Sequence, residues 1–241
     1  MDDSIQFVPR PVRGRRFTHS RRVRLADTAP DGALRVDGLA RYLQDVATDD
    51  WADAGLDPAD VWVVRRTAVR VAEGGRWPRL GERVHLVTWC GGIGAAWAER
   101  RSDLESADGL LVETVGLWVP LDQDGRPLRL GNRFDHVYGE ACGGRRISSR
   151  VEVPALPQGG VDRPWAVRYA DLDVVGHVNN AAAWAAVAEA AGGPVRSAVV
   201  SHHQPVAAGE EVSLRTTPAE GGVDAWLHVD GDVRLSARVV R

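Results

Sequence analysis

The sequence predicts an α+β fold in which one plan, a long central helix with an antiparallel sheet wrapped around it, occurs twice. The first observation is an internal repeat. Val23-Arg-Leu-Ala-Asp27 matches Val167-Arg-Tyr-Ala-Asp171 at an offset of 144 residues (167 − 23), and Gly32 matches Gly176 at the same offset. The second is the order of elements, because each copy continues into a helical run and then into several short strands. Two such units can join their sheets and form a crevice between them.

The first copy begins with a predicted strand at 21–26 and a loop at 27–32. The spacing of apolar residues then predicts a helix over 37–54, which Gly55 ends. Segments rich in β-branched residues and separated by Gly and Pro predict four further strands. We expect these strands at 61–71, 82–89, 95–104 and 110–120, and a turn at 122–125.

The second copy repeats this order. A strand is predicted at 165–169 and an alanine-rich helix at 180–191, whose small side chains would let a curved sheet approach closely. Asp230-Gly231 predicts a tight hairpin between the last two strands. Residues 131–163 lack clear periodicity and are predicted to be a linker, so domains are expected at 1–130 and 164–241. The remaining strands are expected at 195–204, 211–217, 225–229 and 233–240.

Composition limits the function. A net charge of −3 argues against a general polyanion binder, although the arginines are clustered and every basic residue is Arg. Each cluster is expected to be either a solvated surface or a dock for an acidic protein. One cluster lies in residues 1–25 and comprises Arg10, Arg13, Arg15, Arg16, Arg21, Arg22 and Arg24; the other comprises Arg145, Arg146 and Arg150.

Several features indicate a soluble protein without a cofactor. Cys90 and Cys142 form no metal-binding pattern, and we expect two free thiols in a reducing compartment. Met-Asp-Asp at the start is unlike a secretory signal, and the apolar run 181–188 is too short to span a bilayer. We therefore expect a cytoplasmic protein with no membrane or nucleic-acid partner. No phosphate-binding loop or dinucleotide fingerprint is present, so no cofactor and no metal is expected.

The segment 171–180 reads Asp-Leu-Asp-Val-Val-Gly-His-Val-Asn-Asn and is the strongest functional signal. Its carboxylates, imidazole and amides directly precede a helix, whose free N–H groups and dipole suit the oxyanion of acyl transfer. Simple helix caps and a structural histidine are the alternative interpretations. A calcium loop fails, because Val175 and Ala182 occupy its fifth and twelfth positions, where oxygen ligands are required.

Several motifs in register resemble the acyl-ACP thioesterase family over residues 16–240. Segment 171–180 is similar to the family's Asp-Leu-Asp-Val-Asn-x-His-Val-Asn-Asn. The resemblance implies two tandem hotdog domains and hydrolysis of fatty acyl-ACP to free fatty acid and ACP, in fatty acid biosynthesis and lipid metabolism. It also implies a monomeric pseudo-dimer or a homodimer. The first-half segments that match are Val61-Trp-Val-Val64 with Arg66 and Val69, Trp77-Pro-x-x-Gly81-Glu, Thr88-Trp89 and Gly116-Leu-Trp118-Val119.

The resemblance assigns the family's catalytic Asp to Asp173 and its catalytic His to His177. Asp173 would be the general base or the nucleophile, and His177 would position water or donate to the thioester oxygen. Plant members carry Asn at the position of Val175 and a Glu-Cys pair at Gln204 and Pro205. Gln204 is expected to orient the water. The expected catalytic residues are therefore Asp173, His177, Gln204 and Asn179.

Neighbouring positions are expected to bind substrate. Backbone N–H groups of residues 176–178 would complete an oxyanion hole, and Gly176 would allow a close backbone approach. One of Asn179 and Asn180 should cap the helix, and Asp171 should be structural. The expected substrate-binding residues are Gly176, Val178, Asn180 and Val175.

The first copy carries Ala29 and Ala33 where Asp173 and His177 would align, so it is expected to lack catalytic residues. The resemblance assigns it the acyl-chain pocket. Arg145, Arg146 and Arg150 would dock the acidic carrier protein. The alternatives are a hotdog acyl-CoA thioesterase, a hotdog dehydratase and a non-catalytic acyl-thioester-binding protein. Trp51, Trp62, Trp89, Trp97 and Trp118 are expected to be core or to line the pocket.

Overall fold

The computed structural model describes residues 5–57 and 61–241; the Met-Asp-Asp start discussed above lies outside them. The first half contains a helix, α1 (Val36–Asp53), and the second contains α3 (Asn180–Ala191). The strands of the first half are β1 (Phe17–Arg22), β2 (Val61–Val71), β3 (Arg83–Ile93), β4 (Ala98–Ser106) and β5 (Gly109–Leu121). Those of the second are β6 (Val161–Trp165), β7 (Ser197–His202), β8 (Val212–Ala219), β9 (Gly222–Val229) and β10 (Asp232–Val240).

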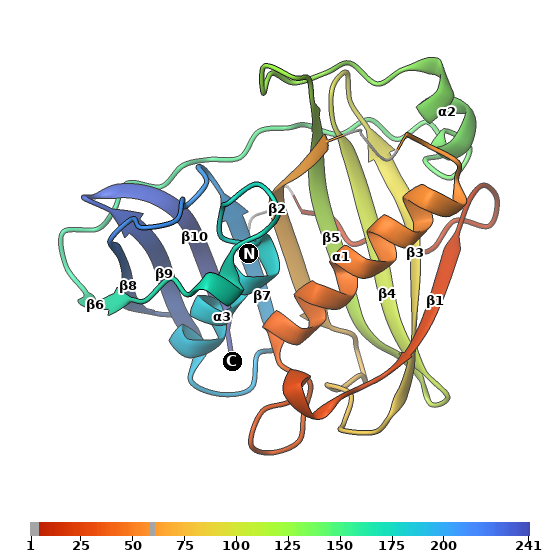
Figure 1. Ribbon diagram of the computed structural model, residues 1–241. Helices are drawn as coiled ribbons and strands as arrows, with labels where there is room; N and C mark the ends of the chain where they lie inside the picture. The colour runs from red at the N-terminus through yellow and green to blue at the C-terminus, as the bar shows by residue number, and fades with distance from the viewer. Residues whose placement is uncertain (1–4, 58–60) are drawn as a thin grey trace.

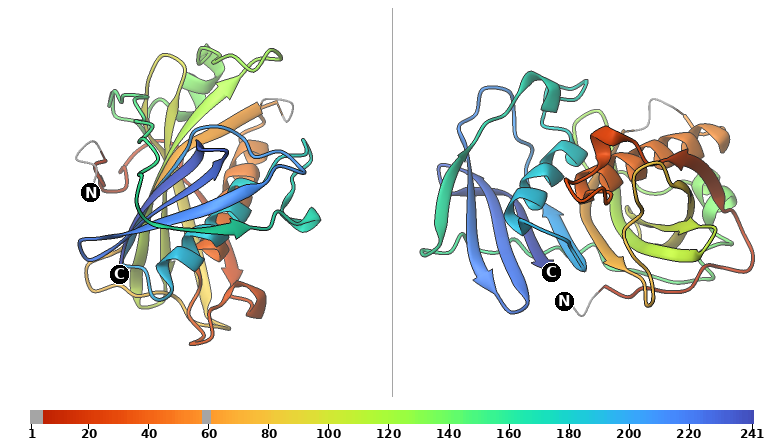
Figure 2. Two further views of the ribbon diagram at one scale, coloured as in Figure 1. Left: turned by 90° about the vertical axis from the view of Figure 1, so that its left-hand side faces the viewer. Right: turned by 90° about the horizontal axis from the view of Figure 1, so that it is seen from below.

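The ten strands form one antiparallel sheet whose order reads the same in both halves. From one edge it runs β1-β3-β4-β5-β2 and continues β7-β10-β9-β8-β6, so each strand has a counterpart at the mirrored position. The halves join where β2 pairs with β7, from Arg66 opposite Ser201 to Arg70 opposite Ser197. Both long helices lie on the same side of this sheet, which curls around them (Figures 1 and 2).

The predicted repeat is present in the backbone hydrogen bonds before each helix. The N–H of Asp27 donates to the carbonyl of Arg24, and 144 residues later (171 − 27) Asp171 donates to Arg168. Three more pairs of backbone hydrogen bonds correspond in the same way, each from an N–H to a carbonyl. Ala29 donates to Ala33 as Asp173 donates to His177, and Gly32 donates to Ala29 as Gly176 donates to Asp173. Arg35 donates to Asp27 as Asn179 donates to Asp171. Each set includes a short 3-10 helix, at Leu25–Asp27 and Tyr169–Asp171. The two halves therefore hold their loops in one conformation.

The two helices pack against each other inside one shared core. On α1, Leu39, Tyr42 and Val46 are buried at helical spacing. On α3, Trp184, Val187 and several alanines are buried, and Ala186 has no exposed surface. Alanines allow both α1 and the sheet to approach α3 closely, as the sequence predicted.

Some predicted elements are placed differently. β1 ends at Arg22, because the chain turns into the 3-10 helix instead of continuing to Ala26 as a strand. The strand expected at 165–169 lies at 161–165, an edge position where Pro164 needs no ladder partner for its nitrogen. The predicted linker contains a helix, α2 (Asn132–Tyr138), and the first residues of β6. Seven residues are too few for the periodicity of α2 to stand out.

Candidate active site

The segment 171–180 folds into a closed turn in front of α3. The N–H of Asp173 donates to the carbonyl of His177 at 2.8 Å, and the N–H of Gly176 donates back to the carbonyl of Asp173 at 3.1 Å. Gly176 has a φ of +81°, which explains the glycine. A Cβ added there would meet no protein atom within 4 Å, so the left-handed backbone, and not packing, is what favours glycine in the fold. A close approach of this backbone to substrate stays a prediction.

The two carboxylate oxygens of Asp173 have different surroundings. Oδ1 accepts hydrogen bonds from the N–H groups of Val175 (3.0 Å) and His177 (3.2 Å). Oδ2 has no hydrogen-bond partner among the described residues. The half-buried side chain thus stabilises the turn with one oxygen and leaves the other without a partner in the described part of the chain. The adjacent Val175, an expected substrate contact, is 69% exposed.

The expected oxyanion hole is wrong in its donors. The N–H of Gly176 donates to Asp173, that of His177 to the Asp173 carboxylate, and that of Val178 to the carbonyl of Val206. All three groups are therefore already paired. At the start of α3, the N–H groups of Asn180 and Ala182 have no acceptor among the described residues.

The two asparagines have different roles. Oδ1 of Asn179 accepts from the N–H of Ala181 at 2.8 Å, so Asn179 is the N-cap of α3. The cap uses only Oδ1 of Asn179, so a part of Asn179 in catalysis stays a prediction, and Asn180 is the amide without a capping role. Asp171 is structural, as predicted: it is buried and accepts three hydrogen bonds from Arg168. The hydrogen bond and the charge of Arg168 lower the pKa of Asp171.

Gln204 is exposed and engaged elsewhere. Its amide oxygen accepts from Arg234 at 2.5 Å, and Arg234 also donates to Glu210 at 2.9 Å. Glu210 in turn accepts from the N–H of Ala207, which pairs with His177 in a β-bridge. The structure thus supports His177 through an Arg234–Glu210 pair that sequence reasoning missed. A carboxylate near the family's Glu position was the only available signal.

His202, at the end of β7, was also missed. Its neighbours at alternate positions, Ala198 and Val200, belong to the core on the helix side of the sheet. Nε2 of His202 is buried without a hydrogen-bond partner among the described residues. Burial lowers the pKa of His202 to about 4, so its ring is neutral near pH 7.

The first half keeps the turn without the carboxylate and the imidazole. Ala29 and Ala33 occupy the positions of Asp173 and His177, and the side chain of Asp31 replaces Asp173 as the acceptor for the N–H of Ala33, at 2.9 Å. A groove of 1480 Å³ between α1 and α3 touches Ala29 and Asn179. Asp173 and His177 are not part of the lining of this groove.

Aromatic residues close one end of the first half. Trp51 and Trp62 lie edge to face at 5.4 Å and contact Phe134 and Tyr138 of α2. Tyr138 donates to Asp50, which also pairs with Arg100. Trp89 is core, being almost fully buried, whereas Trp97 and Trp118 are half-buried.

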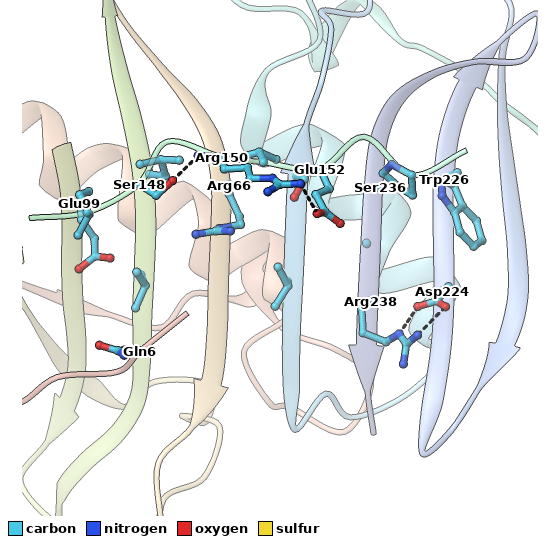
Figure 3. A pocket seen from close by; sticks show the side chains of 18 of the residues that line it. Gln6, Arg66, Glu99, Ser148, Arg150, Glu152, Asp224, Trp226, Ser236 and Arg238 are labelled. Atoms are coloured by element: carbon cyan, nitrogen blue, oxygen red, sulfur yellow. Dashed lines mark hydrogen bonds and ion pairs between the residues drawn. The ribbon is translucent and has the colours of Figure 1, made fainter. Parts of the chain in front are cut away.

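The arginines of the linker border a second groove, of 1000 Å³, on the face of the sheet away from the helices (Figure 3). Arg145 is held there by Glu99 at 2.5 Å, so it is poorly placed for docking. Arg150 is exposed and only 3.3 Å from the equally exposed Glu152, and Arg146 is exposed. In the N-terminal cluster, Arg10, Arg15 and Arg21 form ion pairs within the chain.

Within residues 5–57 and 61–241, no group of three or more His, Cys, Asp or Glu side chains is arranged to hold a metal ion. No helix of that part has the length and apolar character needed to cross a membrane.

Comparisons with known proteins agree with this architecture. Residues 14–130 match the acyl-ACP thioesterase N-terminal domain and residues 157–228 match the acyl-ACP thioesterase C-terminal domain. An uncharacterized protein of Mycobacterium tuberculosis is 29% identical over 250 residues, which cover 100% of this chain and 98% of the relative.

Solved structures share the fold. The 12:0-ACP thioesterase from Umbellularia californica is 20% identical with a TM-score of 0.78, over 95% of this chain and 98% of the other. An acyl-ACP thioesterase from Bacteroides thetaiotaomicron is 19% identical with a TM-score of 0.78, over 93% and 97%. These similarities confirm the predicted pair of tandem hotdog units.

Proposed function

The chain belongs to the acyl-ACP thioesterase family, and on this premise we propose that it hydrolyses fatty acyl thioesters of acyl carrier protein to free fatty acid and ACP. The observation that carries the proposal is an asymmetry between two equal turns. Only the second half has a carboxylate and an imidazole at the paired positions, Asp173 and His177, where the first half has Ala29 and Ala33. One active site per chain follows, with the first half left to hold the acyl chain.

In the proposed mechanism, Oδ2 of Asp173 takes a proton from water as that water attacks the thioester carbon. His177 positions the water from the opposite end of the same turn. The negative charge that develops on the carbonyl oxygen is stabilised by the free N–H groups of Asn180 and Ala182 at the start of α3. When the C–S bond breaks, the proton held by Asp173 passes to the departing thiolate.

The test is hydrolysis of a panel of acyl-ACP and acyl-CoA thioesters with chains from C8 to C18, followed by release of free thiol. We expect turnover of acyl-ACP, with kcat/KM higher for the carrier-bound form than for the CoA form of the same chain. Equal or higher kcat/KM for every CoA substrate would overturn the choice of carrier protein and support an acyl-CoA thioesterase instead.

One observation favours a second candidate, an acyl-thioester-binding protein without turnover. Oδ1 of Asp173 is already engaged in the turn, and the family's Glu-Cys pair is replaced by Gln204 and Pro205, of which Gln204 is bound to Arg234. In the same panel, saturable binding of an acyl-ACP with no thiol release would support this candidate and contradict the enzyme.

A further inference from the structure

The only two cysteines of the chain lie in contact although 52 residues separate them. Cys90 belongs to β3, and Cys142 follows α2 in the segment that connects the halves. Both are free and buried, and their Sγ atoms are 3.3 Å apart. No local pattern predicts this contact, because the two cysteines belong to unrelated segments of the sequence.

The surroundings of the pair allow a bond between the sulfur atoms. A disulfide has an S–S length of about 2.05 Å, so the sulfur atoms would need to approach by about 1.2 Å from their 3.3 Å separation. Cys142 lies in a turn that continues into two exposed glycines, Gly143 (φ +55°) and Gly144 (φ +78°). On the other side, the strand register shifts between Cys90 and Gly92. Both backbones are irregular here and can absorb a small displacement.

The two thiols differ in acidity. The hydrogen bond between the two sulfur atoms lowers the pKa of Cys142, whereas the same interaction and burial raise the pKa of Cys90. Because the thiolate is the nucleophile in thiol–disulfide exchange, and because Cys142 directly precedes the exposed Gly143 and Gly144, Cys142 is the thiol that reacts first.

We propose that Cys90 and Cys142 form a reversible intramolecular disulfide by exchange with a low-molecular-weight disulfide. The Cys142 thiolate attacks one sulfur of the reagent, forming a mixed disulfide and expelling one thiolate. Cys90, after losing its proton, attacks Sγ of Cys142 and expels the second. The two cysteines are oxidised, the reagent is reduced to two thiols, and the two cysteine protons end on those thiols.

Such a bond would fasten α2 and the connecting segment to β3. Sγ of Cys142 lies 3.4 Å from the carbonyl of Tyr138, the last residue of α2. Through Tyr138 the bond would fix the aromatic residues that close the first half, around Trp51 and Trp62. Formation of the disulfide does not depend on the proposed function. Only an effect of the disulfide on acyl-chain selection would rest on the proposed function.

The test measures the equilibrium of the pair in mixtures of oxidised and reduced glutathione. The full-length protein is equilibrated in native buffer and in concentrated urea, starting from both the oxidised and the reduced form. Free thiols are then trapped by alkylation and counted by mass. Cys90→Ser and Cys142→Ser are the controls and must yield no intramolecular bond.

We expect the folded protein to favour the disulfide at least about tenfold more than the unfolded chain, because the fold already closes the loop between the cysteines. We also expect the oxidised form to melt at a higher temperature than the reduced form. An equal or weaker preference for the disulfide in the folded protein would overturn the proposal, since it would mean that the native contact opposes the bond.

Discussion

Asp173 combines two tasks in one side chain. Oδ1 holds the turn through the N–H groups of Val175 and His177, while Oδ2 remains available to water. In the first half Asp31 keeps the turn, and Ala29 stands at the position of Asp173. The shared turn therefore supplies geometry, and in the proposed mechanism the residues at two paired positions decide whether it also supplies chemistry.

His202 predicts a pH dependence of stability. Burial sets its folded-state pKa at about 4, below the value of about 6.5 expected for the unfolded chain. Between these values the unfolded chain binds more protons, so stability falls as the pH drops through this window. Between pH 7 and pH 5 the unfolding free energy of the unmodified protein should therefore fall by about 1–2 kcal/mol more than that of the His202→Gln variant.

Urea unfolding at pH 7, 6 and 5 measures this difference. The matched control is His136→Gln, because His136 is exposed on α2 and its substitution should leave the pH slope unchanged. A pH slope for His202→Gln equal to that of the unmodified protein would contradict the burial argument.

At this scale the sequence predicted the residues better than their contacts. Asp173, His177 and the asparagine cap follow from the motif, because residues only a few positions apart must share one turn. The pairing of the Val178 N–H could not be predicted, since its acceptor is the carbonyl of Val206, in a distant segment of the chain. The Arg234–Glu210 pair depends on tertiary structure in the same way.

Among the elements, α3 depends on its cap. Asn179→Ala removes the acceptor for the N–H of Ala181, and we expect a loss of about 1 kcal/mol in unfolding free energy. Asn180→Ala keeps the cap and should cost less than half as much, since Ala has the higher helix propensity. Thermal or urea unfolding of both variants measures which substitution is more destabilising. A larger loss of unfolding free energy for Asn180→Ala would mean that the cap is misassigned.

The alanines of α3 predict an asymmetric tolerance to larger side chains. Ala186 has no exposed surface, so Ala186→Leu should overpack the core around α3 and destabilise the protein by about 1–3 kcal/mol. Ala185 lines the groove between α1 and α3, so a leucine there has room and Ala185→Leu should destabilise the protein less. Urea unfolding compares the two, and equal costs would refute close packing at Ala186.

The elements themselves were predictable where a long pattern exists. β2 at 61–71 and α3 at 180–191 lie where a β-branched run and an alanine-rich run place them. The 3-10 helices and α2 are too short to produce a period. α2 is held by tertiary contacts, such as the stacking of Phe134 on Trp62 and of Tyr138 on Trp51.

The whole molecule is a repeated unit in which one copy is proposed to keep catalysis. Its mirrored strand order and the β2–β7 joint place two helices in one core. The repeat was visible in the sequence, but the joint was not, since no local pattern specifies which strand of each half lies at the centre.

Docking of the acidic carrier protein would use exposed arginines on the surface of the molecule. Arg146 and Arg150 are exposed, so the double substitution Arg146→Glu and Arg150→Glu should raise KM for acyl-ACP several-fold at low salt. It should leave KM for a small acyl thioester unchanged. Steady-state kinetics with both substrates tests this, and equal effects on the two would place docking elsewhere. Arg145→Glu is a poor probe, because it breaks the ion pair with Glu99.

The most direct test of the proposed chemistry is the rate of acyl-ACP hydrolysis by Asp173→Asn. The amide oxygen can still accept from Val175 and His177, so the turn should survive while the basic oxygen is lost. We expect kcat to fall by about 100-fold or more, with Asp31→Asn in the equivalent turn of the first half as a control within about twofold of the unmodified protein. Full turnover by a folded Asp173→Asn protein would contradict the assignment of Asp173 as the catalytic base.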